Sequence, residues 1–461
     1  MTDSSLTSNT VELQEYEHGR KSTCFHISKS HHTGHEPRSP FKVIPQDRRL
    51  RRSPSTGTHH SPLVIKLISL FEEFFLAEDY PDGVSEDYLE FQFWNTIQTG
   101  CIAITGALAF HMVFTGMGIG NPASSSLAAT IIWLLKDGAG MLGKIFFTWI
   151  QSSHLDADCK RWHYYGDLLN DFSFLLDLIS PYFGSYLLLI TSTSNICRAI
   201  VGVIHGSTRA VIFQHHARNN NLADISAKCA SLETIINVIL LTLLDKTPVL
   251  LWSVFTTLTT IHIYANYRSK RALLFNIFNF NRFYLVCFNY FNTGTISTVE
   301  TVNNQEPILY PLKKPYACRL GLSIKHIPSP TLQSANIQRY KQSDNERFLI
   351  LFSQEQFYVL LKPEIDDDDL LRLHFYLMVV MYTMQNKNVL KISESTTNFE
   401  NVFQQIRNEL QNTSDHINFE TCLDILQQSN DQYYQNFKRC CIEKGWNMKR
   451  CLFNLEIHRC K

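Results

Sequence analysis

The sequence predicts a mainly α fold: a multi-helix bundle of the membrane type, followed by a small C-terminal α+β domain. Charged residues make up only 18% of the 461 residues, whereas about 25% is usual for a soluble domain. No Asp, Glu, Lys or Arg occurs in the 39 residues from Ile97 to Leu135, and about 20 apolar residues are enough for a membrane-spanning helix. The deficit of charge is therefore concentrated in one part of the chain.

The N-terminal region, residues 1–60, is rich in Ser, Thr, His, Pro and Arg and has few periodic apolar positions. We expect it to be disordered, because such a composition cannot offset the entropy of ordering. Its basic run RRLRRSPST (48–56) fits a solvated linker, a regulatory patch or a contact with an anionic membrane surface. A Ser-Pro pair at 61–62 then predicts the start of a helix over LVIKLISLFEEFFLAE (63–78).

Four apolar blocks follow. We predict one membrane span over 97–120, ended by an Asn-Pro pair at 121–122, because proline lacks a backbone N–H and restricts the residue before it. The second block, 123–150, contains Lys136 and Asp137, and is too polar to face lipid on every side. It is therefore expected to be a broken or interior-facing span.

The last two blocks each contain a proline. Block 172–204 is interrupted by Pro181, and block 232–264 is interrupted just before and at Pro248. The halves of the fourth block are short for a full span. They predict either a re-entrant hairpin or a single span kinked at the proline.

Basic residues lie on both sides of the apolar region, at 48–52 and at 268–282. The positive-inside rule therefore places both flanks in the cytosol, while the organelle is not indicated. No apolar signal segment opens the sequence, so insertion is expected to use an internal span. The alternative is a large soluble helical bundle with very apolar core helices.

Residues 300–461 predict a small α+β domain in the cytosol. FLILF (348–352) and FYVLL (357–361) have the composition of two short strands joined by a turn. The remaining predicted elements are a helix from the acidic run 366–369 to Met384, helices over 398–412 and 428–445, and a strand over 449–457.

Several apparent motifs indicate no cofactor, metal or enzymatic activity. GAGMLG (138–143) satisfies the dinucleotide-binding pattern but lies between apolar runs, where small residues more simply allow two helices to approach closely. Twelve cysteines form no CxxC pair, so no metal site is predicted. His215, His216 and His262 have no evident nucleophile partner. The balance of 42 basic and 42 acidic residues argues against a nucleic-acid partner.

Polar residues at helical spacing form two stripes. Over 161–180, Asp167, Asn170, Asp171 and Asp177 share one side of the predicted helix. In the next apolar block, basic residues including Arg198, His205 and Arg209 lie close to one line. The two stripes either pair inside a bundle, which offsets the cost of burying their charges, or line a polar cavity for a small ligand.

Five segments together resemble the root UVB sensitive (RUS) family over roughly 71–285. They are YPDGVSEDYLEFQFW (80–94), LLKDGAGMLGKI (134–145), DADCKRWHYYGDLLNDFSFLLDLISP (156–181), STRAVIFQHHARNNNLADISAKCASLET (207–234) and IHIYANYRSKRALLFNIFN (261–279). The sequence departs from the family pattern at His205, where glycine is usual. The resemblance implies a RUS-type helical membrane domain over 61–285 with no established reaction. Plant members are connected with UV-B responses, auxin distribution and vitamin B6 homeostasis.

The leading functional hypothesis is a non-enzymatic membrane protein whose helical domain organises partners or handles a small polar ligand. Possible partners are the membrane and other copies or relatives of the chain, in a homo- or hetero-oligomer. The alternatives are a soluble or peripheral scaffold for protein interactions and, with least support, a membrane enzyme. The candidate ion-pair or cavity residues are Lys136, Asp137, Asp167, Asn170, Asp171, Asp177, Arg198, Arg209, Arg218, Asp224 and Lys228.

Overall fold

The computed structural model describes residues 10–17, 20–29, 41–47, 76–77, 80–118, 126–151, 155–240, 248–310, 316–328, 347–353, 356–385, 405 and 432–453. The chain forms two compact units. The first unit comprises Met1–Tyr88 and Phe213–Ile235, and the second comprises Leu89–Ile212 and Ile236–Lys461.

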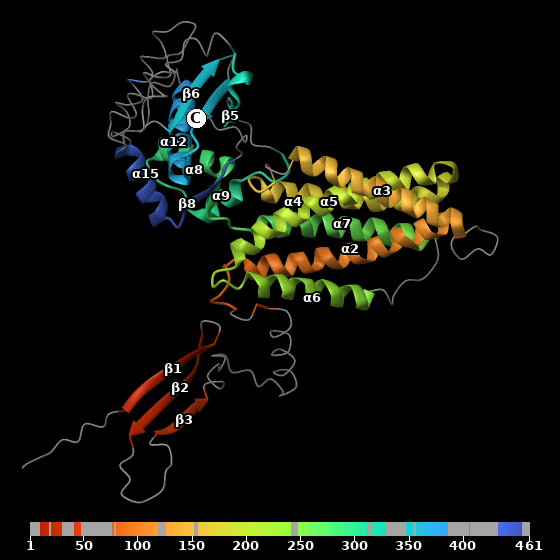
Figure 1. Ribbon diagram of the computed structural model, residues 1–461, viewed down its shortest axis with the longest axis horizontal. Helices are drawn as coiled ribbons and strands as arrows, with labels where there is room; N and C mark the ends of the chain where they lie inside the picture. Colours follow the sequence, from red (N-terminus) through yellow and green to blue (C-terminus); the bar gives the residue numbers. More distant parts are fainter. Residues whose placement is uncertain are drawn as a thin grey trace, which may run out of the picture. The chain divides into compact units, whose positions relative to one another are not determined.

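Long helices dominate the described chain between residues 88 and 272 (Figure 1). They are α2 (Tyr88–Gly116), α3 (Ser126–Gln151), α4 (Cys159–Ile179), α5 (Leu187–His216), α6 (Leu222–Leu240) and α7 (Pro248–Ala272). A short 3-10 segment, η1 (Ser180–Tyr186), separates α4 from α5. This break follows from Pro181, which cannot donate the backbone hydrogen bond that would continue α4. The mainly helical fold class is confirmed.

Among the described residues, two helical stretches are long and apolar enough to cross a membrane by length and composition, namely Tyr88–Gly116 and Cys159–His216. The first contains most of the span predicted over 97–120. The second stretch joins α4, η1 and α5. The predicted block 172–204 therefore covers the end of α4, all of η1 and the first part of α5. The predicted block 232–264 is likewise divided between α6 and α7, and α7 begins at Pro248.

The glycine-rich segment of α3 lies close to α5. A Cβ atom added to Gly140 would lie 2.5 Å from Asn195 Nδ2, and one added to Gly143 would lie 2.8 Å from Ile196 Cγ2. Both separations are too short for a side chain, so these two glycines let the helices approach closely. Such packing by small residues is the interpretation that the sequence favoured over cofactor binding.

The C-terminal part of the second unit is an α+β assembly. Strands β6 (Phe348–Ser353) and β7 (Gln356–Leu361) pair antiparallel, and β5 (Ala317–Leu320) pairs parallel with β7. The two strands predicted from FLILF and FYVLL are therefore present. A second, two-stranded sheet joins β4 (Ile277–Asn279) to β8 (Asn447–Leu452).

Helices pack with these strands into one apolar core. They are α8 (Phe280–Thr293), α9 (Val299–Gln305), α12 (Asp367–Gln385) and α15 (Gln432–Glu443). The 3-10 turn η2 (Ile324–His326) contributes no buried residue. Phe278 stacks on Trp446 with ring centroids 4.4 Å apart, which ties the two strands of the small sheet together. The helix predicted over 398–412 and that predicted over 63–78 lie almost wholly outside the described residues.

The N-terminal region differs from the predicted disorder. Strands β1 (Thr10–Glu17), β2 (Arg20–Lys29) and β3 (Phe41–Asp47) form an antiparallel sheet in the order β1-β2-β3. Its register pairs Val11 with Ile27 and Leu13 with Phe25. The composition of all 60 residues concealed these short alternating runs, in which β-branched and aromatic residues favour strands.

Candidate functional site

Three acidic residues of α4 are buried. The exposed fractions are 0% for Asp167, 7% for Asp171 and 0% for Asp177. Helix α4 contains no proline and continues to Ile179, two residues before Pro181. Buried carboxylates are costly unless they are paired, so their neighbours define what this face of α4 can do.

Asp177 pairs with Arg198 of α5. The guanidinium carbon of Arg198 also lies 4.9 Å from the centroid of the Phe110 ring and 5.4 Å from that of Phe174. The cation is thus held between aromatic faces and a carboxylate, an arrangement that compensates its removal from water.

Asp171 pairs with His262 of α7, with Oδ2 lying 2.7 Å from Nδ1. One turn further along α7, Asn266 Nδ2 donates to the carbonyl of Tyr164, 3.3 Å away. The remaining oxygens of Asp171 and Asn266 and the second ring nitrogen of His262 are buried and have no hydrogen-bond partner among the described residues. These atoms form a polar seam between α4 and α7.

Asp167 is the centre of a larger network. Its Oδ2 accepts a hydrogen bond from Gln98 Nε2 at 2.6 Å and lies 3.7 Å from Lys270 Nζ. Its Oδ1 lies 3.1 Å from His205 Nε2 without hydrogen-bond geometry. Lys270 Nζ also contacts Ser269 Oγ at 3.0 Å. Burial lowers the pKa of Lys270 to about 8, although the charge of Asp167 acts in the opposite direction.

A second histidine adjoins this network. The rings of His163 and His205 stack with centroids 4.6 Å apart. Thr208 Oγ1 donates to the carbonyl of Ile204 at 2.7 Å, so it accepts from His163 Nδ1 at 2.8 Å. This bond fixes the tautomer of neutral His163 and leaves its Nε2 as an acceptor, 3.9 Å from Asp167 Oδ2.

The predicted residues Lys136 and Asp137 of α3 lie apart from the network around Asp167. Lys136 is buried, with its Nζ 4.5 Å from the centroid of the Trp133 ring. Asn195 of α5 donates to the Lys136 carbonyl at 3.0 Å and approaches Asp137 Oδ1 at 3.4 Å. These residues therefore secure the contact between α3 and α5.

The other predicted residues are more dispersed. Asn170 is buried on α4, and half-buried Arg209 lies near enough to Lys270 for its charge to lower the pKa of that lysine. Arg218, Asp224 and Lys228 belong to the first unit, where Arg218 is exposed and the other two are half-exposed. The structure thus brings Asp177 and Arg198 together, and links Asp167 and Asp171 to residues outside the predicted set.

One buried ion-pair cluster was not predicted. Glu306 accepts from Arg282 Nη1 at 3.1 Å and from Asn279 Nδ2 at 3.0 Å, and its Oε2 lies 3.3 Å from Lys160 Nζ. Burial raises the pKa of Glu306, but the charges of Arg282 and Lys160, together with the hydrogen bonds from Asn279 and Arg282, outweigh burial and lower that pKa to about 2. These residues come from separate parts of the sequence, and no spacing rule connects them.

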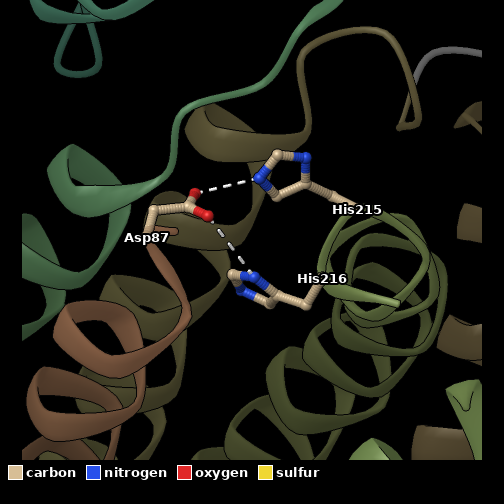
Figure 2. Close-up of side chains that lie close together, drawn as sticks. All are labelled: Asp87, His215 and His216. Atoms are coloured by element: carbon tan, nitrogen blue, oxygen red, sulfur yellow. Dashed lines mark hydrogen bonds and ion pairs between the residues drawn. The ribbon is translucent and has the colours of Figure 1, made fainter. Parts of the chain in front are cut away.

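A further cluster in the first unit was also missed. The carboxylate of Asp87 faces the rings of His215 and His216, one oxygen toward each (Figure 2), with Oδ2 2.9 Å from His215 Nε2 and Oδ1 3.7 Å from His216 Nδ1. Burial raises the pKa of Asp87, but the hydrogen bond from His215 and the charges of both histidines lower it below its usual range. The adjacent histidines were the only sequence signal, and nothing in the sequence linked them to Asp87.

The structure is that of a helical protein with a polar core. Its bundle of long apolar helices contains paired charges in its interior and is joined to a small α+β region. Residues 63–294 match the family described as "Vitamin B6 photo-protection and homoeostasis domain". Residues 295–461 match "Root UVB sensitive protein, C-terminal". The chain belongs to the root UVB sensitive family.

Named relatives agree with this assignment. The chain is 37% identical over 289 residues to RUS family member 1 of Dictyostelium discoideum, covering 60% of this chain and 53% of the relative. It is 32% identical over 330 residues to the protein root UVB sensitive 3 of Arabidopsis thaliana, covering 68% of this chain and 75% of the relative. The match to the Dictyostelium protein thus spans about half of that relative. No solved structure matches the chain.

Proposed function

We propose that the helical region binds a small polar ligand rich in hydrogen-bond donors, and that this is a binding rather than a catalytic function. The observation that carries the proposal is the polar seam between α4 and α7. Asp171 Oδ1, His262 Nε2 and Asn266 Oδ1 are buried there without hydrogen-bond partners among the described residues. Such atoms are costly unless a ligand or an ordered water satisfies them.

The chemistry of these atoms defines the ligand. Ionised Asp171 accepts a hydrogen bond from His262 Nδ1, so Nε2 of the neutral His262 ring carries a lone pair. Asn266 uses its amide nitrogen on the Tyr164 carbonyl, which leaves its oxygen as an acceptor. All three atoms accept hydrogen bonds, and they would be satisfied by the hydroxyl or amino groups of a ligand.

The family description names vitamin B6, whose forms carry hydroxyl and amino groups, so we choose pyridoxine and pyridoxamine as the first test ligands. Titration calorimetry on the full chain in detergent should detect binding of at least one of them. Asn266→Leu removes an acceptor at similar volume and should weaken binding by about tenfold or more. Glu300→Gln, which changes an exposed side chain outside α4 and α7, should leave binding intact. Equal binding by wild type and Asn266→Leu, or failure of both compounds to bind, would contradict the proposal.

We also propose that the protein is associated with a membrane, with both flanks in the cytosol. Helix α3 supports this, because it exposes large apolar side chains along its length, including Leu134 (70%), Leu142 (71%) and Trp149 (80%). Exposed apolar surfaces of this kind usually contact lipid or a partner. Carbonate extraction separates the alternatives: an integral protein stays with the membranes, whereas release without detergent would favour a peripheral scaffold that uses α3 to bind a second copy or a relative.

A further inference from the structure

Two distant segments of the first unit are held together by backbone contacts. Val84 and Ala217 form an antiparallel β-bridge, and Ser85 N donates to the carbonyl of His216 at 3.2 Å. The backbone N–H of Arg218 donates to the carbonyl of Gly83, also at 3.2 Å. These contacts hold the segment that leads into α2 beside the end of α5, and so fix the backbone positions of the residues at this junction.

Three side chains with metal-binding atoms converge at this junction (Figure 2). Asp87, His215 and His216 each present one ligand atom, and the three atoms lie within 4.8 Å of one another. The exposed fractions of the side chains are 3%, 9% and 0%. The slight exposure of His215 gives the cluster access to solvent.

The separations between these atoms suit a four-coordinate ion. Zinc binds imidazole nitrogen and carboxylate oxygen at about 2.0–2.1 Å with tetrahedral angles, which places neighbouring ligand atoms about 3.3 Å apart. The distance from Asp87 Oδ2 to His215 Nε2 is 2.9 Å and that from Asp87 Oδ1 to His216 Nδ1 is 3.7 Å, so each oxygen of the carboxylate lies within about 0.4 Å of that separation from one histidine. Binding an ion would draw the three ligand atoms, which already lie within 4.8 Å of one another, closer together.

Surrounding residues orient the ligands. Ser85 Oγ lies 2.6 Å from His216 Nδ1, and the same hydroxyl also hydrogen-bonds Asp87. When His216 Nδ1 binds an ion, Ser85 therefore retains a partner in the carboxylate. Tyr88 packs edge-on against the His216 ring, with centroids 5.5 Å apart. Supporting contacts of this kind are typical of metal ligands in proteins.

We propose that Asp87, His215 and His216 form a binding site for a divalent transition-metal ion of the zinc type, with a fourth position open to water. The ion connects the start of α2 to the end of α5 and stabilises the first unit. Three protein ligands of these types with one open position are a common arrangement for zinc.

A similar cluster in the second unit is less suited to a cation. His163, Asp167 and His205 also bring their ligand atoms within 4.8 Å of one another. Lys270 Nζ, however, lies 3.7 Å from Asp167 Oδ2 and opposes a second positive charge there. This cluster therefore provides a matched control, since it has the same ligand types but a competing ammonium group.

The experiment uses the full chain, purified in detergent and stripped with a chelator. Co²⁺ is titrated in first, because its visible absorption reports tetrahedral coordination, and Zn²⁺ is then used to displace it. Wild type and His205→Asn should bind one equivalent with the tetrahedral spectrum. Asp87→Asn and His215→Gln should weaken binding by at least about tenfold, because the first removes the negative charge of one ligand and the second removes an imidazole nitrogen. Zn²⁺ should raise the thermal midpoint of wild type and not that of Asp87→Asn.

Three results would overturn the proposal. The first is the absence of stoichiometric Co²⁺ or Zn²⁺ binding by wild type. The second is undiminished binding by Asp87→Asn and His215→Gln. The third is loss of binding in His205→Asn with retention in Asp87→Asn, which would assign the ion to the cluster in the second unit. None of these readouts depends on the polar ligand proposed for the seam between α4 and α7.

Discussion

Replacing Glu306 with glutamine should destabilise the protein by leaving two cations without their shared carboxylate. Lys160 and Arg282 are 4% and 2% exposed, and Glu306 is 4% exposed. Glutamine keeps the shape and can still hydrogen-bond, but it removes the negative charge. Removing one partner of a buried ion pair typically costs about 3–5 kcal/mol, because the remaining charge stays buried.

The pKa of Glu306 gives an independent value for the free energy that these ion pairs contribute to folding. Lowering that pKa from 4.5 to about 2 corresponds to about 3 kcal/mol at neutral pH, at about 1.4 kcal/mol per pKa unit. Because the pKa is lower in the folded protein, this stabilisation is complete above about pH 4.5 and is lost as the pH falls toward about 2. The difference in unfolding free energy between wild type and Glu306→Gln should therefore shrink over the same interval.

Urea unfolding followed by intrinsic fluorescence, performed at several pH values in detergent, measures this difference. Glu300→Gln is the matched control, since Glu300 is exposed on α9, the helix whose C-cap is Glu306, and its replacement should cost less than about 1 kcal/mol. A Glu306→Gln penalty that stays constant between pH 7 and pH 3 would refute the electrostatic reasoning. A penalty as small as that of the control would refute the assigned ion pairs.

Two further predictions concern the packing of the helices. Asp177→Asn and Arg198→Gln should each destabilise the protein by about 3 kcal/mol, and the double variant by clearly less than the sum; additive losses in a thermodynamic cycle would contradict the pairing. Gly143→Ala should cost about 1–3 kcal/mol because its Cβ would meet Ile196 at 2.8 Å. Among the described residues, no atom beyond the local backbone of α3 lies within 4 Å of a Cβ added to Gly138. Gly138→Ala should therefore be neutral or stabilising by up to about 1 kcal/mol; equal thermal midpoints for the two alanine variants would exclude the close contact of Gly143 with Ile196.

The helices could be predicted from the sequence because each is encoded locally. An uncharged run longer than 20 residues and an isolated proline determine where a helix continues and where it ends, so α2 and the break at Pro181 follow from their own residues. The strands FLILF and FYVLL were equally local. The short strands β1–β3 were missed because composition was averaged over a region in which the alternating runs occupy only part of the length.

Clusters between distant residues could not be predicted in this way. Asp87 and His216 come together through the bridge between Val84 and Ala217, and Glu306 meets Lys160 through the packing of α9 near the start of α4. Neither contact has a periodic or spaced pattern in the sequence. A single sequence identifies residue types that need partners, whereas the partners themselves depend on the tertiary arrangement.

The acidic residues of α4 show where this limit lies. At about 100° per residue, Asp171 is rotated by about 40° from Asp167 in one direction and Asp177 by about 80° in the other. Asp171 accordingly meets His262 of α7, Asp177 meets Arg198 of α5, and Asp167, between them, contacts both helices through Lys270 and His205. Helical periodicity thus correctly predicted that the three carboxylates share one polar side of α4. It did not predict that this side contacts both α5 and α7, because that depends on the angles between the carboxylates. The residue between the two helices has partners on both, which is why Asp167, rather than either flanking carboxylate, is the centre of the buried network.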